Sequence, residues 1–236
     1  MSNSLAGTQL TFEFSERSDF YLSDYEPGSN ASLVERLTAI TSGEPGHVYL
    51  QGGEGTGKTH LLLAMCRLAQ DLGDGAVYAP LKDMVAGAPS ALDSLAQRRL
   101  VCVDDIDAVS GNPSWCVALF NLWNACESTG AVFLGACRVP VHSLDTGLDD
   151  LDSRLRASLQ LRLTPLEDAD REGAMRRLAA RRGVDLPAEG ARYLLHRMPR
   201  DMHSLADTVA ALDKHSLARR RRITVPLARE WLDSGP

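Results

Sequence analysis

The segment GGEGTGKT, from Gly52 to Thr59, is the feature that most constrains how this chain can fold. It fits the pattern G-x-x-x-x-G-K-[ST] and follows HVYLQ, which has the character of a strand. The next segment, THLLLAMCRLAQDL, has the apolar spacing of a helix that ends at Gly73. Glycine-rich segments often just turn the chain, but a loop of this spacing between a strand and a helix predicts a site for nucleotide phosphates.

Each residue type in this loop has a physical reason. Glycine allows backbone conformations that other residues avoid, so successive N–H groups can point into one concavity that holds phosphate oxygens. The helix that follows adds its positive end. Lys58 brings a mobile charge to the outer phosphates, and the Thr59 hydroxyl can ligate Mg²⁺. We expect ADP or ATP to be bound by the whole run, which comprises Gly53, Glu54, Gly55, Thr56, Gly57, Lys58, Thr59 and His60.

The segment LVCVDD, residues 100–105, tests this hypothesis independently. Its continuous apolarity predicts a central parallel strand that is buried on both faces. In folds with such a loop, an acid at the end of a neighbouring buried strand holds the magnesium, and Asp104 is placed for that role together with Thr59. Asp105, one residue on, is the candidate for orienting an attacking water. The alternative is a pair of carboxylates at a solvated strand end.

The order of segments predicts an α/β fold followed by a small helical domain. Strands and helices alternate up to about Thr164, which implies a parallel sheet with crossover helices. Within this part, SALDSLAQRR at 90–99 has the pattern of a polar helix. Three helical runs follow Pro165 without a strand between them, and RITVPLAREWL closes them as a short extended piece and a last helix. We therefore predict an arm at 1–17, a nucleotide-binding domain at 18–164 and a helical lid at 165–236.

The composition is that of an ordinary soluble protein, with 44% hydrophobic and 24% charged residues. No apolar stretch is long enough for a membrane span, and the N-terminus lacks the basic start and apolar run of a signal peptide. The five cysteines form no CxxC pair, which favours reduced thiols. We expect a cytoplasmic protein that makes no contact with a membrane and holds no metal besides Mg²⁺.

The net charge of −6 is unevenly distributed. From Pro165 onward there are 14 Lys/Arg and 11 Asp/Glu, a net +3, whereas the preceding part carries 11 and 20, a net −9. This asymmetry indicates two modules with different partners, two modules that face each other, or random drift of surface charge. The run RRRR at 219–222 is compatible with nucleic acid, with an acidic protein face or with a solvated helix end.

Several motifs together resemble the DnaA family of AAA+ ATPases over nearly the whole chain after about residue 18. They are GGEGTGKTH with its final histidine, VCVDDID, EPGSN at 26–30, DLDSRL at 150–155 and RDMHSLADTVAAL. The resemblance implies an AAA+ sheet with a helical lid, and it maps an arginine finger onto Arg154. A surface ion pair is the alternative role for Arg154. Two positions depart from the family: Cys137 stands where a polar sensor positions water, and His203 where a lid arginine contacts the γ-phosphate.

Two features separate this chain from the replication initiator itself and make it resemble the Hda family of short DnaA-like proteins. The sequence ends at Pro236, where the initiator would continue into a DNA-binding domain, and residues 104–137 contain no Lys or Arg. Because phosphate binding relies on basic side chains, we expect weak or no direct DNA binding. Hda proteins load onto the sliding clamp of DNA polymerase III, its β subunit, and stimulate hydrolysis of the ATP bound to DnaA. The resemblance thus implies both proteins as partners, with Arg154 supplied in trans.

The arm carries a segment, QLTFEF, that resembles a clamp-binding peptide of the Q-L-x-L-P-L kind. In such a peptide the glutamine hydrogen-bonds in a pocket and the apolar side chains fill a cleft. The residues that match are Gln9, Leu10, Phe12 and Phe14, with phenylalanines where leucines are usual and Glu13 in place of the proline. An edge strand or a disordered tail is the alternative.

The two sensor departures predict slow intrinsic hydrolysis, with the bound nucleotide setting the protein's own shape. A DNA-dependent ATPase of the helicase-loader or DnaA kind is the alternative function, and a nucleotide-binding scaffold at the cell pole or membrane is a third. An ADP-bound monomer and a homodimer are both compatible with the sequence.

Overall fold

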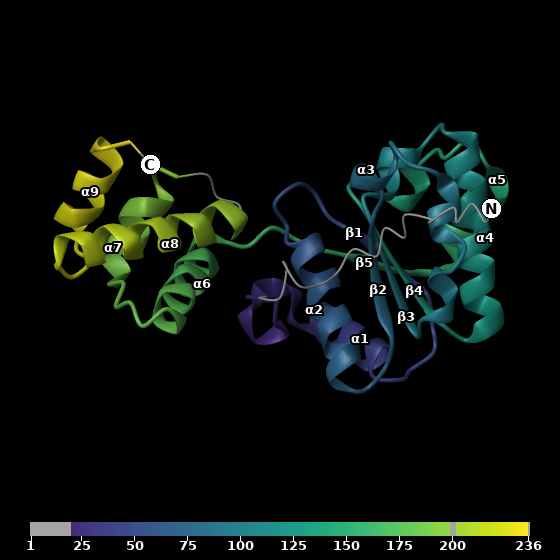
Figure 1. Cartoon of the computed structure of the whole chain (residues 1–236), viewed down its shortest axis with the longest axis horizontal. Coiled ribbons are helices and arrows are strands. Elements are labelled where there is room, and N and C mark those ends of the chain that lie inside the picture. The colour runs from purple at the N-terminus through teal and green to yellow at the C-terminus, as the bar shows by residue number, and fades with distance from the viewer. Residues whose placement is uncertain (1–19, 199–201, 236) are drawn as a thin grey trace, which may run out of the picture.

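The computed structural model describes residues 20–198 and 202–235, so Gln9, Leu10, Phe12 and Phe14 lie outside the described residues. In Figure 1 a sheet with helices on both faces forms one lobe, and the helices after residue 167 form the other. The predicted boundary near Thr164 falls between the last strand and the first helix of the second lobe.

The sheet has five parallel strands in the order β2-β3-β4-β1-β5. They are β1 (Val48–Gln51), β2 (Ala76–Pro80), β3 (Leu100–Asp104), β4 (Val132–Cys137) and β5 (Leu159–Arg162). Every residue of β3 is buried, as its continuous apolar run predicted, and every residue of β4 is buried as well. Because all strands are parallel, the loops after β1 and β3 leave the sheet at the same edge. The α/β architecture predicted from the alternation is thereby confirmed.

Two apolar layers cover the sheet. On one face lie α1 (Ala31–Thr41) and α2 (Lys58–Asp71), whose leucines pack with Leu50 and Leu134. On the other lie α4 (Pro113–Thr129) and α5 (Asp149–Ala157), which pack against the face that carries Tyr49 and Phe133. A short helix, α3 (Leu81–Met84), follows β2. The five cysteines are buried and unpaired within these layers.

The predicted polar helix at 90–99 is wrong. This segment forms two separate 3-10 turns, Pro89–Leu92 and Leu95–Gln97, that pack against α4. Asp93 and Ser94 separate the turns, and side chains of this kind favour local turns over continued helix. Leu92 and Ala96 are buried, so tertiary packing holds the segment in place without a regular helix.

Neither β5 nor α5 was predicted as a regular element. The strand is short, lies at the edge of the sheet and is mostly exposed, so it lacks the apolar run that marked β3 and β4. The helix has three acidic residues in its first turn and only Leu151, Asp152 and Leu155 buried. Its apolar face is therefore too narrow to signal a helix by spacing alone.

The lid is a separate helical bundle with its own core. It consists of α6 (Asp168–Arg181), α7 (Ala188–Leu195), α8 (Met202–Arg219) and α9 (Val225–Asp233). Met175, Leu194, Leu205 and Trp231 are among the buried side chains at its centre. The Thr224 hydroxyl caps α9 by accepting from the backbone N–H of Leu227 at 3.4 Å. In the described part of the lid all regular elements are helices, which confirms the predicted fold class.

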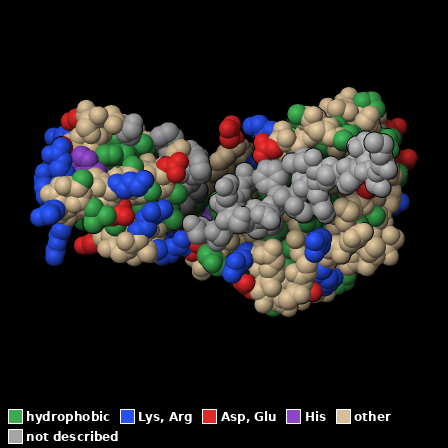
Figure 2. All heavy atoms as spheres, in the orientation of Figure 1, with side chains coloured by type: hydrophobic (Ala, Val, Ile, Leu, Met, Phe, Trp, Pro, Cys, Tyr) green, Lys and Arg blue, Asp and Glu red, His purple; other side chains and the backbone are tan. Residues whose placement is uncertain are grey.

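Lys and Arg side chains gather on the lid, many of them at the end away from the sheet (Figure 2). Arg219 and Arg221 both pair with Glu230 of α9 at 3.0 and 2.9 Å, so part of the RRRR run is engaged within the lid. Among the helices that the structure describes, none has the length and apolarity needed to cross a membrane.

Candidate nucleotide site

The loop between β1 and α2 has the backbone geometry of a phosphate-binding loop. Gly55 and Gly57 have φ angles of 71° and 90°, which side-chain-bearing residues rarely adopt. At Gly57 a Cβ atom would also lie 3.1 Å from Cε2 of Tyr25. Glycine is thus required there both by the turn into α2 and by the approach of the Tyr25 ring.

Lys58 is the buried cation of this loop. Its side chain donates to the carbonyl oxygens of Gly52 and Gly53 at 2.6 and 2.8 Å, and the residue is only 8% exposed. Burial lowers the pKa of its ammonium group, and the carboxylates of Asp104 and Asp105 partly oppose that shift. A buried ammonium group held by neutral carbonyls fits an anionic ligand, because a phosphate would supply the opposite charge.

Thr59 and Asp104 form the oxygen pair expected of a magnesium site. The Thr59 hydroxyl donates to Oδ2 of Asp104 at 2.6 Å, and Asp104 is 1% exposed at the end of β3. The same carboxylate accepts from the Tyr78 hydroxyl at 2.9 Å and from the backbone N–H of Asp105 at 2.9 Å. Hydroxyl and carboxylate oxygens suit Mg²⁺, so these residues fit the metal that accompanies a nucleotide.

Asp105 adopts a left-handed conformation with φ 53° and ψ 49°, which is uncommon for a residue other than glycine. Its carboxylate lies 3.6 Å from the guanidinium of Arg138, which is also 3.6 Å from Asp107. Burial, followed by the charge of Asp104, raises the pKa of Asp105, while Arg138 lowers it. The carboxylate of Asp105, which was predicted to orient water, therefore forms an ion pair with Arg138, a residue that the sequence motifs did not predict.

Cys137, at the sensor position, lies at the end of β4 and is fully buried. Its thiol contacts Oδ1 of Asp107 at 3.4 Å, and burial raises its pKa. A thiol kept neutral in this way is a weak partner for a water molecule.

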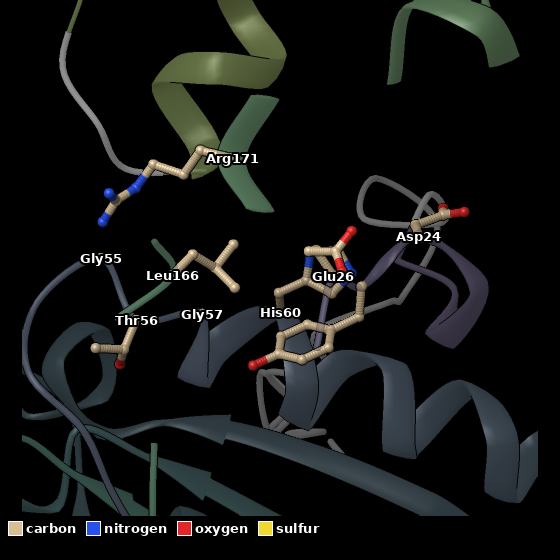
Figure 3. Close-up of a pocket in the computed structure, with 9 residues that line it drawn as sticks. Asp24, Glu26, Gly55, Thr56, Gly57, His60, Leu166 and Arg171 are labelled. Atoms are coloured by element: carbon tan, nitrogen blue, oxygen red, sulfur yellow. The ribbon is translucent and has the colours of Figure 1, made fainter. Parts of the chain in front are cut away.

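A pocket lies beside the phosphate loop, between the segment after residue 20, the loop itself and the start of the lid (Figure 3). His60 contributes one wall, with its ring in edge contact with Phe20 and Tyr25 at centroid distances of 5.0 and 5.5 Å. Burial lowers the pKa of His60, which favours the neutral ring. The lining residues are Asp24, Tyr25, Glu26, Gly55, Thr56, Gly57, His60, Leu166 and Arg171. Aromatic and apolar groups next to a phosphate loop suit the base of a nucleotide.

The segment EPGSN ties the pocket to the start of the lid. The buried Asn30 side chain donates to the carbonyl oxygen of Thr164 at 3.0 Å and accepts from the Thr164 N–H at 2.9 Å. Gly28 has φ 49°, and a Cβ there would lie 2.7 Å from Oδ2 of Asp170 in α6. Ion pairs from Asp24 to Arg181 and from Glu26 to Arg177 connect the same segment to α6.

Several of these residues were missed by the sequence analysis. Tyr25, Leu166 and Arg171 come from separate segments and share no motif. Tyr78 could have been found as the position in β2 that lies two residues before the strand's carboxyl end. Of the predicted ligands, Glu54 is exposed, and His203 lies in α8 with its side chain outside the described part.

Arg154 does not belong to this site. It lies on α5, is exposed, and its guanidinium stacks over the ring of Trp123. The helix ends just before Leu159, which pairs with Val48 at the start of β1, whereas the phosphate loop follows the end of β1. Since β1 has four residues, at least about 10 Å of strand separates the two ends. Arg154 therefore lies toward the amino ends of the strands, away from the protein's own phosphate loop.

The parallel sheet, the phosphate loop and the helical lid together form a fold that is similar to those of several solved structures. The fold is similar to domain III of the replication initiation protein DnaA from Thermotoga maritima, with TM-score 0.78 and 19% identity over 92% of this chain and 98% of that one. It is also similar to DnaA bound to AMPPCP and single-stranded DNA, with TM-score 0.68 and 19% identity over 85% and 67% of the two chains. The Holliday junction branch migration motor RuvB of Thermotoga maritima gives TM-score 0.66 and 15% identity over 86% and 68%.

The lid gives a more specific match than the fold as a whole. Residues 168–232 match the family described as "Hda, lid domain". The lid is thus similar to that of Hda, and the fold of the whole chain is similar to that of DnaA domain III.

Proposed function

We propose that this protein is a nucleotide-binding regulator of replication initiation that stimulates hydrolysis of the ATP bound to DnaA. The match of the lid to the Hda family supports this assignment. The observation that carries the mechanism is the position of Arg154, exposed on α5 and away from the protein's own phosphate loop. A guanidinium that cannot serve its own site is available to the triphosphate of a neighbouring molecule, where such fingers accelerate hydrolysis by orders of magnitude.

The protein's own nucleotide, ADP or ATP, has a structural role on this proposal. Lys58 would hold its phosphates, and Thr59 and Asp104 would hold Mg²⁺, which when bound neutralises phosphate charge. Tyr78 fixes the Asp104 carboxylate from a second strand. Cys137 is a poor partner for water and Arg138 engages Asp105, so intrinsic hydrolysis is slow.

Delivery to DnaA is proposed to depend on the sliding clamp. Gln9, Leu10, Phe12 and Phe14 would bind the clamp as an extended peptide. This attachment raises the local concentration of Arg154 near DnaA on the same DNA.

A DNA-dependent ATPase is the second candidate function. The observation in its favour is the intact pairing of Thr59 with Asp104, because a protein that hydrolyses ATP needs this magnesium site. DNA-stimulated hydrolysis by the isolated protein, without DnaA, would favour this candidate.

The decisive experiment measures hydrolysis of ATP on DnaA in the presence of clamp loaded on DNA. The unmodified protein is compared with Arg154→Ala and with a matched control, Arg156→Ala, which alters another exposed arginine of α5. We expect Arg154→Ala to lose stimulation by roughly 10³-fold and the control to retain it. Equal rates for the unmodified protein and Arg154→Ala would refute the proposal, as would failure of the unmodified protein to stimulate.

A further inference from the structure

The side chain of Arg154 rests on an aromatic platform. Its guanidinium carbon lies 4.9 Å from the ring centroid of Trp123, which belongs to α4 and is 4% exposed. A guanidinium over an indole face is a favourable cation–π contact. The indole is almost entirely inside the protein, while the arginine that covers it is exposed.

Four parts of the chain hold this indole in place. Its Nε1–H donates to Oγ of Ser158 at 3.4 Å, just after α5. The His47 ring meets it edge-on at a centroid distance of 4.6 Å. Nδ1 of His47 accepts from the backbone N–H of Phe133 at 3.0 Å, and Nε2 lies 2.7 Å from Oε2 of Glu127. The orientation of Trp123 is thus set by α4, by the start of β4 and by the residues that flank β1 and β5.

The same network also contacts the backbone of Arg154. The hydroxyl and the backbone N–H of Ser158 both donate to the Arg154 carbonyl oxygen, at 3.1 and 3.2 Å. Trp123 therefore contacts the side chain directly, and through Ser158 it is connected to the backbone of the same residue. Both ends of Arg154 are fixed by one set of contacts.

Arg154 differs in this respect from the other arginine at the end of α5. Arg156 pairs with Asp152 at 3.7 Å. Among residues 20–198 and 202–235, no carboxylate lies within ion-pair distance of Arg154. The indole orients the guanidinium without neutralising its charge. Within the part of the chain that the structure describes, the N–H groups of the fork stay available for phosphate oxygens.

We propose that Trp123 is a positioning residue that presents Arg154 to the triphosphate of the neighbouring molecule, an inference that rests on the proposed function. An arginine held by a carboxylate would have to leave that partner before it could act. An arginine stacked on a ring is already oriented and keeps its full charge. Ser158 completes the arrangement by fixing the indole and the end of α5 together.

The test compares Trp123→Leu, which removes the aromatic face, with Trp123→Phe, which keeps one. We measure the maximal rate of ATP hydrolysis on DnaA, and the concentration of this protein that gives half of that rate. Trp123→Leu is expected to lower the maximal rate about tenfold or more and to leave the half-saturating concentration unchanged, because positioning is lost while docking is kept. Trp123→Phe is expected to stay within about threefold of the unmodified protein.

A double mutant separates positioning from general packing. In the Arg154→Ala background, Trp123→Leu should have no further effect, because residues that act through one another are not additive. A further loss of the same size in that background would show that Trp123 acts independently of Arg154 and would overturn the inference. Full activity of Trp123→Leu alone would do the same.

A spectroscopic measurement covers the case in which Trp123→Leu does not fold. The chain has three tryptophans, so the indole N–H signal of Trp123 can be followed by NMR in the protein without DnaA. Arg154→Ala should shift this signal and Arg156→Ala should not, and an unshifted signal in Arg154→Ala would overturn the inference. The proposed function fails separately, if Arg154→Ala stimulates hydrolysis as well as the unmodified protein.

Discussion

Thr59 and Asp104 are 45 residues apart in the sequence and are joined by a hydrogen bond of 2.6 Å. Thr59 lies in the first turn of α2 and Asp104 ends β3, so the bond joins the helix that follows β1 to a strand that β4 separates from β1 in the sheet. This pair, with Lys58 beside it, defines where the phosphates and the metal of a nucleotide would be bound.

Replacement of Lys58 should abolish nucleotide binding without unfolding the protein. Lys58→Ala removes the positive charge that the loop brings to the phosphates, so we expect the Kd for ADP to rise by about 100-fold or more. Titration calorimetry measures this change. Lys82→Ala, which alters an exposed lysine of α3, is the matched control and should bind as the unmodified protein does. Equal affinities for the two variants would show that the phosphates bind elsewhere.

Asp104→Asn should remove the dependence of nucleotide binding on Mg²⁺. The amide keeps the size of the carboxylate but not its charge, and Mg²⁺ prefers anionic oxygen ligands. In the unmodified protein we expect a chelator to weaken ADP binding, and in the variant the affinities with and without chelator should converge. Asp107→Asn is the control on a nearby carboxylate. A chelator effect of undiminished size in Asp104→Asn would exclude this residue as the metal ligand.

His60 should make the protein less stable below neutral pH. Burial lowers its folded-state pKa below the ordinary value of about 6.5, so the unfolded chain binds more protons in this range. The contribution of His60 to the free energy of unfolding is therefore complete above the unfolded pKa and falls as the pH drops through it. We expect the Tm of His60→Gln to change less between pH 7.5 and pH 5.5 than that of the unmodified protein.

The control for the His60 measurement is His142→Gln, which alters a histidine in a surface turn. This variant should keep the pH dependence of the unmodified protein. If the Tm of His60→Gln changed with pH as much as that of the control, the protonation of groups other than His60 would be responsible for the loss of stability at low pH.

The N-terminal arm should be required for clamp binding and dispensable for nucleotide binding. Removal of residues 1–14, or the paired change of Phe12 and Phe14 to alanine, takes away the side chains that would fill the clamp's apolar cleft. We expect the clamp affinity, measured by surface plasmon resonance, to fall at least about tenfold while the Kd for ADP stays constant. Unchanged clamp affinity would refute the peptide assignment, and Thr8→Ala is a control within the arm.

The parts of the fold that sequence reasoning reached are those with a local signal. The glycine pattern located the loop before α2, and the uninterrupted apolar run located β3 with Asp104 at its end. The lid helices were found because their apolar spacing persists over several turns. In each case the information lies within a single segment of the chain.

The residues that were missed depend on tertiary contacts. Arg138 stands next to the predicted sensor position, but its pairing with Asp105 and Asp107 exists only once β3 and β4 lie side by side. Tyr25 and Arg171 meet the loop only after the segment before α1 and the lid have packed around it. The turns at 89–97 replaced the predicted helix because burial of Leu92 and Ala96 under α4 outweighed local spacing.

The polarity of the sheet has a consequence for assembly. The nucleotide pocket opens at the carboxyl ends of the strands, whereas Arg154 is presented toward their amino ends. A contact that joins these two unlike surfaces is head to tail, and it does not close on itself through a two-fold axis. A molecule that supplied Arg154 through such a contact would still have its own pocket free for a third molecule. In a row of molecules joined in this way, every Arg154 would point in the same direction.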